Sequence, residues 1–189
     1  DSGNGGGSTV GAYQINVGLD VFVDGTGFGA GTWGGGTWGS TSSLSNLNQL
    51  RLWSLDSFGE DLLSCARAGS VFYWDKTGGL SSRAVALTAL TGANFAPTKG
   101  LQVLVSDVDR HVIVLGSDPI NDAGTARTGA IDPLLIAFSD QENAAEWEPR
   151  SDNTAGSLRC SAGSEIIGGL RARQETLIWT DVALYSLQF

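Results

Sequence analysis

Short apolar runs separated by glycine, aspartate, asparagine and proline dominate the chain from residue 50 onward. Runs of about four to eight residues that are rich in β-branched and aromatic side chains are typical of strands. The pattern predicts strands at Leu50–Leu55, Leu62–Ala66, Val71–Trp74, Ala84–Leu90, Leu101–Ser106, His111–Leu115, Leu134–Phe138, Leu158–Cys160, Thr176–Thr180 and Leu184–Phe189. Ile166–Arg173 fits a strand or a turn of helix, and Ala144–Trp147 fits a turn of helix. The sequence therefore predicts an all-β fold.

Three stretches of the chain share one pattern. Residues 60–75, 109–140 and 174–187 each open with a polar pair and a buried strand, and a second strand returns after a turn. The stretch 109–140 carries a longer insertion between its strands. Divergent hairpin repeats spaced by roughly 40 to 60 residues are typical of propeller blades. The repeats predict a partial β-propeller built of short antiparallel hairpins, with a β-sandwich as the alternative.

Glycine is concentrated at the start of the chain, where residues 1–40 contain no Lys or Arg. The tetrapeptide Gly-Thr-Trp-Gly occurs twice there, around Trp33 and Trp38. Glycine disfavours regular helix and strand, whereas large aromatic side chains are costly to leave in water. We expect residues 1–43 to form a loop or extended segment anchored by Phe28, Trp33 and Trp38, with a disordered linker as the alternative. The propeller-like blades are expected in residues 44–189.

Composition narrows the class of protein further. The chain has 189 residues, 41% of them hydrophobic, which is sufficient for a core without disulfides or metals. Its two cysteines form no Cys-x-x-Cys pair, which argues against a disulfide framework and a cysteine zinc site. Apolar runs such as Val112–Leu115 are far shorter than the ~18 residues of a membrane helix, so no membrane contact is expected. Because the chain contains no Met, we expect it to begin inside a longer reading frame.

The residues that most often carry nucleophilic catalysis are isolated in this sequence. His111 is the single histidine, it begins an apolar run, and no Gly-x-Ser-x-Gly motif accompanies it. We therefore expect a hydrogen-bonded core or rim residue at His111. Cys65 and Cys160 lie on expected strands and should be small buried side chains without reactive roles. The sequence predicts no enzyme, with no catalytic, cofactor-binding or metal-binding residue.

Acidic residues gather in two parts of the chain. One group lacks the ligand spacing of a calcium loop, and its members are expected to be solvated turn carboxylates. These are Asp107, Asp109, Asp118 and Asp122. The second group surrounds an aromatic residue and comprises Glu142, Glu146, Trp147 and Glu148. Since glycosidases use paired carboxylates, the second group motivates an alternative function, a carbohydrate-binding or glycan-cleaving receptor-recognition propeller.

The segment Phe138–Trp147 resembles the Asp-box turn of sialidase propellers, which reads Ser-x-Asp-x-Gly-x-x-Trp. Here the spacing differs and the Gly is missing. In sialidases the box is a structural turn remote from catalysis. The arginine triad of those enzymes has no counterpart that can be assigned from this sequence.

Longer strings of residues carry a second resemblance, which covers residues 13–189. They resemble, in the same order, a family of tailed-phage virion structural proteins. The strings are Tyr13–Gly18, the Gly/Trp tract through Trp38, Leu50–Leu63, Ala68–Asp75, Arg110–Ile113, Ile131–Ile136, Phe138–Asn143, Trp147–Pro149 and Arg173–Asp181.

This resemblance implies the nozzle, or tail tubular protein B, of short-tailed phages. Such proteins are propeller-based, form a hexameric ring below the adaptor, and continue the channel through which DNA leaves. They are several hundred residues longer, so the chain is expected to be an N-terminal or internal part. The implied location is the phage tail of the virion, after synthesis in the host cytoplasm, and the family supplies no catalytic residues.

The acidity of the chain is compatible with a DNA conduit. A net charge of −9 repels phosphates, so genomic DNA is expected to pass without tight binding. In a ring, Phe28, Trp33 and Trp38 are candidate subunit contacts, because glycines let a neighbouring backbone approach closely. The alternative is that these aromatic residues pack on their own domain. A secreted adhesive module, suggested by the Gly-rich start alone, is a third possible function.

Overall fold

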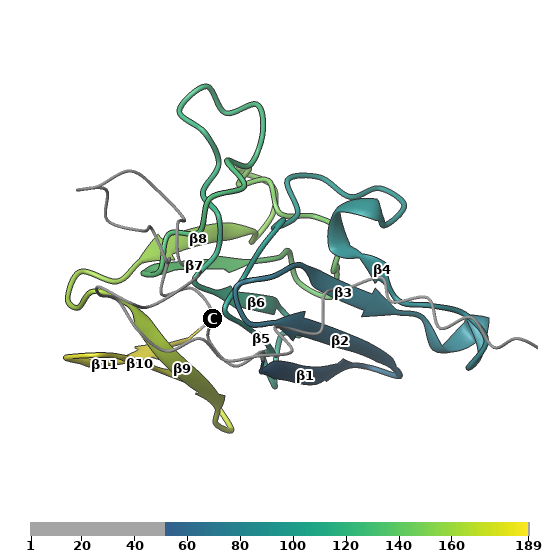
Figure 1. Cartoon of the computed structure of the whole chain (residues 1–189), viewed down its shortest axis with the longest axis horizontal. Coiled ribbons are helices and arrows are strands. Elements are labelled where there is room, and N and C mark those ends of the chain that lie inside the picture. The colour runs from purple at the N-terminus through teal and green to yellow at the C-terminus, as the bar shows by residue number, and fades with distance from the viewer. Residues whose placement is uncertain (1–51, 189) are drawn as a thin grey trace, which may run out of the picture. The chain divides into compact units, whose positions relative to one another are not determined.

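Antiparallel strands supply almost all regular structure in residues 52–188, the part of the chain that the computed structural model describes (Figure 1). The exceptions in this part are two single 3-10 turns, Lys76–Gly78 and Leu87–Ala89. The all-β fold expected from the sequence is therefore confirmed. The expected boundary between residues 43 and 44 lies outside the described residues and stays a prediction.

The strands form three sheets, and the strand order within each sheet follows the chain. The first sheet contains β1 (Trp53–Phe58), β2 (Asp61–Ala66), β3 (Val71–Trp74) and β4 (Val85–Ala86). The middle sheet contains β5 (Gln102–Val105), β6 (Val112–Leu115), β7 (Leu135–Phe138) and β8 (Gly156–Arg159). The last sheet contains β9 (Ile166–Arg171), β10 (Thr176–Thr180) and β11 (Leu184–Leu187). All pairings are antiparallel, so each sheet is a simple meander.

The middle sheet packs between the other two sheets and shares a hydrophobic core with each. The core on the side of the first sheet consists of Leu63, Cys65, Val71, Leu87, Ala96, Val103, Val105, Val112, Val114, Ala137, Ala144 and Trp147. The core on the side of the last sheet consists of Leu104, Ile113, Leu115, Leu134, Ile136, Cys160, Ile166 and Ile178. Because successive side chains of a strand point to opposite faces, the apolar run Val112–Leu115 contributes to both cores.

The first strands of the three sheets lie together, with β1 beside β5 and β5 beside β9 (Figure 1). From these strands the sheets spread apart, and β4 and β11 lie on opposite sides of the view. The three sheets are therefore packed in chain order, with β1, β5 and β9 adjacent to one another and the later strands of each sheet farther apart.

Most expected strands are found, with ends that differ by one or a few residues. The strand expected at Leu50–Leu55 is displaced to Trp53–Phe58, because the chain turns at Gly59, whose φ is 68°, directly after it. Of Ala84–Leu90, only the first part is strand and a 3-10 turn follows. Ile166–Arg173 is a strand up to Arg171.

The turn of helix expected at Ala144–Trp147 is wrong. The backbone N–H of Trp147 donates to the carbonyl of Asn94 at 2.9 Å, in a distant segment of the chain. The Trp147 side chain is fully buried in the core between the first and middle sheets. Tertiary contacts therefore determine the backbone here, since packing routinely overrides weak helix propensity.

The three repeated stretches occupy the same place in each sheet. Residues 60–75 contain β2 and β3, residues 109–140 contain β6 and β7, and residues 174–187 contain β10 and β11. Each repeat is therefore the second and third strand of a meander. The insertion in the second repeat is the connection between β6 and β7.

Candidate functional site

The first sheet carries large apolar side chains on the face that points away from the middle sheet. The large side chains of this first outer face are Trp53, Leu55, Leu62, Phe72 and Trp74, and the smaller Ser57, Ser64 and Ala66 lie on the same face. Trp53 and Leu55 are 45% and 62% exposed, and the rings of Trp53 and Phe72 lie 6.4 Å apart. This surface was not predicted from the sequence, although the alternation of apolar and polar residues in β1 is a signal for it.

That alternation is the reverse of what a surface strand usually shows. In an antiparallel sheet with one solvated face, apolar side chains normally point to the core and polar ones to water. In β1 the polar side chains of Ser54 and Asp56 point inward, toward β5. Ser54 Oγ accepts from the backbone N–H of Val103 at 3.0 Å, and Asp56 Oδ2 accepts from that of Val105 at 2.8 Å. The apolar residues of β1 are left on the outside.

The last sheet presents a similar surface on its far side. The register of its strands places Leu170, Leu177, Trp179 and Leu184 on this last outer face. Leu170 is 58% exposed, Leu184 is 56% exposed and Trp179 is 38% exposed. The last outer face also carries Ser186, which donates to the carboxylate of Glu175, whereas the described strands of the first outer face carry no charged side chain. Contiguous exposed apolar surface of this kind marks an interaction site.

Hydrogen bonds between a side chain and a backbone also join the middle sheet to the last sheet. Gln102 Nε2 donates to the carbonyl of Gly169 at 2.9 Å, and Gly169 N–H donates to Gln102 Oε1 at 2.8 Å. The side chain thus imitates a strand that pairs with β9. Arg171 of β9 reaches Asp56 of β1 at 3.4 Å, so the three first strands are joined to one another.

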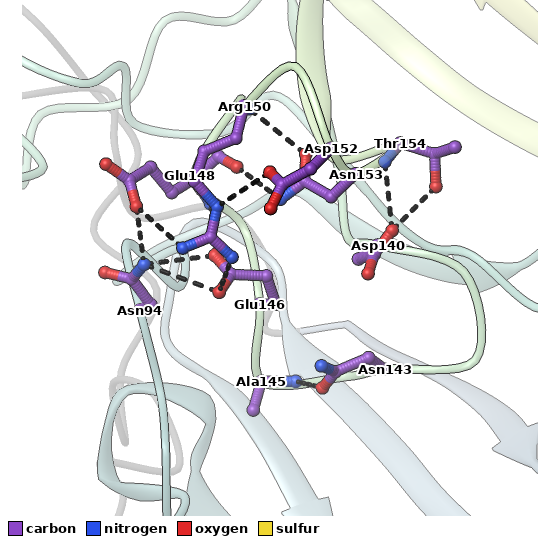
Figure 2. Close-up of polar contacts among 10 residues, drawn as sticks. All are labelled: Asn94, Asp140, Asn143, Ala145, Glu146, Glu148, Arg150, Asp152, Asn153 and Thr154. Carbon is purple, nitrogen blue, oxygen red and sulfur yellow. Dashed lines mark hydrogen bonds and ion pairs between the residues drawn. The ribbon is translucent and has the colours of Figure 1, made fainter.

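A group of charged side chains surrounds Arg150 in the connection between β7 and β8 (Figure 2). The Arg150 guanidinium lies 2.8 Å from Glu146, 3.4 Å from Glu148 and 3.5 Å from Asp152. Asn94 donates to Glu148 at 2.8 Å and to Glu146 at 3.1 Å. Arg150 therefore offsets part of the charge of the three carboxylates, and the hydrogen bonds of Asn94 brace this connection against the segment that contains Asn94. The sequence signal for Arg150 was its spacing of two and four residues from the glutamates.

The geometry around Trp147 does not favour a sugar site. Trp147 is fully buried and donates from Nε1 to the carbonyl of Ala144 at 2.9 Å, so its ring offers no face for stacking on a sugar. Glu142 lies apart from Glu146 and Glu148 and is 3.8 Å from Arg110. The hollow beside the Arg150 group is lined by polar residues of the segments 140–142 and 151–154.

Asp140, the aspartate of the Asp-box-like segment, has a structural role. Its Oδ1 accepts from the backbone N–H and the hydroxyl of Thr154 at 3.0 and 2.8 Å. These hydrogen bonds, the backbone one first, lower the pKa of the Asp140 carboxyl. Asp140 therefore closes the connection between β7 and β8.

The aspartates of the calcium-like stretch are dispersed. Asp107 and Asp122 are exposed and Asp109 is half-buried, which fits the expected turn carboxylates. Asp118 corrects that expectation, because it is completely buried and accepts hydrogen bonds from the backbone and hydroxyl of Thr98 and from Gly129 N–H. No group of three or more potential metal ligands occurs within residues 52–188.

His111 and the two cysteines are buried, as the sequence predicted. His111 is 2% exposed, and its Nδ1 lies 2.8 Å from the carbonyl oxygen of Ser139. Cys65 and Cys160 are buried free thiols, one in each core. Burial raises the pKa of the Cys65 thiol to about 12 and also raises that of Cys160. Both thiols are thereby favoured in the protonated form, and their lack of a reactive role stays a prediction.

Phe28, Trp33 and Trp38 lie outside the described residues, so their role as subunit contacts stays a prediction. Within residues 52–188 there is no helix long and apolar enough to cross a membrane. Comparison of the chain with protein-family models, with curated proteins and with solved structures gives no match.

Proposed function

We propose that this chain is a structural component of a phage virion, in the nozzle of a short tail, and that it acts by assembly and shape. The observation that carries the proposal is the stack of three meanders whose first strands lie together. Antiparallel meanders arranged radially around their first strands are the repeating units of a β-propeller. We therefore propose that the three sheets are consecutive propeller blades.

The outer faces support an assembly role. A chain with exposed apolar side chains on the outer sheet face at each end of its stack is suited to contacts with other proteins. The proposed assembly is a ring of identical subunits, with six as the number implied by the resemblance. Its other proposed neighbours are tail and adaptor proteins of the virion.

The charge of the chain supports a passive role toward DNA. Lysines and arginines that neutralise phosphates provide most non-specific affinity for DNA. This chain has 11 such residues against 20 acidic ones, and Arg150 and Arg171 are already paired with carboxylates. A conduit with this balance lets DNA pass without holding it.

Light scattering after size-exclusion chromatography, followed by negative-stain electron microscopy, tests the proposal on the full chain. We expect a cyclic oligomer with a central channel and a mass that is a multiple of 19.6 kDa. A gel-shift assay at physiological salt should show no stable complex with double-stranded DNA. A chain that stays monomeric, or one that retains DNA under these conditions, would contradict the proposal.

A further inference from the structure

Side chains of β1 occupy the free edge of β5, which lies beside it (Figure 1). In an antiparallel ladder, every second residue of an edge strand points its N–H and C=O away from the neighbouring strand. In β5 one such residue is Val103, whose N–H donates to Ser54 Oγ at 3.0 Å. The next is Val105, whose N–H donates to Asp56 Oδ2 at 2.8 Å. Two polar residues spaced by two along β1 thus serve two N–H groups spaced by two along β5, and the two strands run in the same direction.

The free edge of β9 is occupied in the same way by a side chain of β5. The N–H of Gly169 points away from β10 and donates to Gln102 Oε1 at 2.8 Å. The carbonyl of Gly169 accepts from Gln102 Nε2 at 2.9 Å. In both junctions, polar side chains of one first strand therefore satisfy the outward-pointing backbone groups of the next first strand.

The free edge of β1 has the same backbone groups, but residues 52–188 supply no acceptor for them. The hydrogen bond from Arg67 N–H to the carbonyl of Leu52 fixes which residues of β1 face β2. In that phase, the N–H groups of Trp53 and Leu55 point away from β2. This edge therefore offers two N–H groups, spaced by two, to another segment.

The segment 13–17 carries the same pattern as the start of β1. Its sequence Tyr-Gln-Ile-Asn-Val repeats the order of aromatic, polar, aliphatic and polar residues that opens β1 as Trp-Ser-Leu-Asp. Strict alternation of apolar and polar residues is typical of a strand. Gln14 and Asn16 hold the two polar positions, and the side-chain oxygens of both residue types accept hydrogen bonds.

We propose that residues 13–17 lie along the free edge of β1 as an extended strand that runs in the same direction. The side-chain oxygen of Gln14 accepts from the N–H of Trp53. The side-chain oxygen of Asn16 accepts from the N–H of Leu55. The contact repeats the junction between β1 and β5 one step earlier in the chain. It goes beyond the proposed function and does not depend on the number of subunits in the ring.

The length of the intervening chain favours this segment over a second pair of amides. Asn46 and Asn48 are also spaced by two, but only four residues separate Asn48 from Trp53. Neighbouring strands that run in the same direction need a connection of about a dozen residues or more. The segment 13–17 precedes β1 by more than thirty residues, which is sufficient for such a connection.

Hydrogen exchange of single backbone amides in the full chain, followed by nuclear magnetic resonance, tests the inference. In the wild type, the amides of Trp53 and Leu55 should exchange about tenfold or more slowly than that of Leu80, a residue that is 96% exposed. Gln14→Ala should accelerate exchange at Trp53 about tenfold, because it removes the acceptor. Asn16→Ala should do the same at Leu55.

Two kinds of control distinguish a lost acceptor from a loosened fold. Gln14→Glu and Asn16→Asp keep an acceptor oxygen, so they should keep the protection that the alanine variants lose. Asn46→Ala should leave exchange at β1 unchanged. The amide of Val103, which Ser54 holds, should stay protected in every variant.

The inference is overturned if the wild-type amides of Trp53 and Leu55 exchange as fast as that of Leu80. It is also overturned if both alanine variants keep the protection. Protection that then falls on dilution would identify a second copy as the source of the acceptors, and protection that is independent of concentration would identify another segment of the chain. Equal losses in the alanine and acidic variants would contradict the acceptor role. The particle mass and the DNA assay test the proposed function separately from all these outcomes.

Discussion

The middle sheet and the two sheets beside it are built as similar meanders, but they differ in what covers them. All four residues of Val112–Leu115 in the middle sheet are buried. In Trp53–Phe58 of the first sheet, exposed residues alternate with half-buried ones. The last sheet likewise exposes Leu170 and Trp179 on one side. Among residues 52–188, burial on both faces is most extensive in β5, β6 and β7 of the middle sheet, which lies between the other two sheets.

This difference shows that exposure in the outer sheets comes from position in the stack. An outer sheet with an ordinary solvent face would carry polar side chains there. The first sheet instead places Trp53 and Leu55 outside and uses Ser54 and Asp56 to bind β5. Its sequence is that of an internal sheet, which is the reason to look for a partner on its far side.

The largest expected effect is a difference in stability between substitutions of a buried tryptophan and of an exposed one. Trp147→Ala should lower the free energy of unfolding by about 3–5 kcal/mol, because it removes a fully buried side chain from the core of the middle sheet. Trp53→Ala, on the first outer face, should cost about 1 kcal/mol or less in the monomer. Urea denaturation measures both. Equal losses would show that the first outer face is buried against something in the monomer.

The next effect concerns a buried carboxylate beside the middle sheet. Asp118→Asn should destabilise by about 2–3 kcal/mol, because the amide replaces an acceptor of hydrogen bonds from Thr98 and Gly129 with a donor. Burial also lowers the pKa of the nearby Arg127 guanidinium, which the negative charge of Asp118 partly offsets. Asp122→Asn, on the same loop but exposed, is the control and should change stability by less than about 0.5 kcal/mol. If Asp118→Asn left the stability unchanged, the loop would have to rearrange so that Thr98 and Gly129 find other hydrogen-bond acceptors.

The strands of the middle sheet were the most predictable part of the fold. Runs such as Val112–Leu115 are apolar throughout, and residues buried on both faces of a sheet leave that signature. The repeats also identified the second and third strands of each sheet. The first strand, Trp53–Phe58, was misplaced because Asp56 and Ser57 look like turn residues when the hydrogen bond between Asp56 and β5 is unknown.

The candidate surfaces were less predictable than the fold. The sequence does not distinguish an exposed leucine from a buried one. The outer faces can therefore be recognised only when the order in which the sheets pack is known. The sequence grouped Trp147 with Glu146 and Glu148 as a possible sugar site, but the aromatic ring points into the core. Nothing local indicates that Asn94, more than fifty residues earlier in the chain, supplies hydrogen bonds to both glutamates.

A smaller effect tests the junction between the middle and last sheets. Gln102→Ala should cost about 1–2 kcal/mol, because it removes both hydrogen bonds with Gly169. The loss should be concentrated in β9, so hydrogen exchange of the Gly169 amide should accelerate more than that of the Val103 amide, which Ser54 protects. Gln141→Ala, at an exposed glutamine, is the control. Equal acceleration at the two amides would indicate that the sheets open as one unit.

The smallest effect compares two aspartates that close loops in the same way, one in the middle sheet and one in the last. Hydrogen bonds from Thr154 lower the pKa of Asp140, and those from the Ser164 side chain and backbone lower the pKa of Asp181. A lowered pKa means that the folded state holds its proton less tightly than the unfolded state, whose value is about 3.9. The stabilisation is therefore complete above that value and is lost as the pH falls through the folded value. Asp140→Asn and Asp181→Asn should each be less stable than the wild type at pH 7, with the difference shrinking toward pH 2. Thermal unfolding between these pH values measures the difference, and the half-buried Asp140 should show the larger one because water screens the exposed Asp181 more strongly.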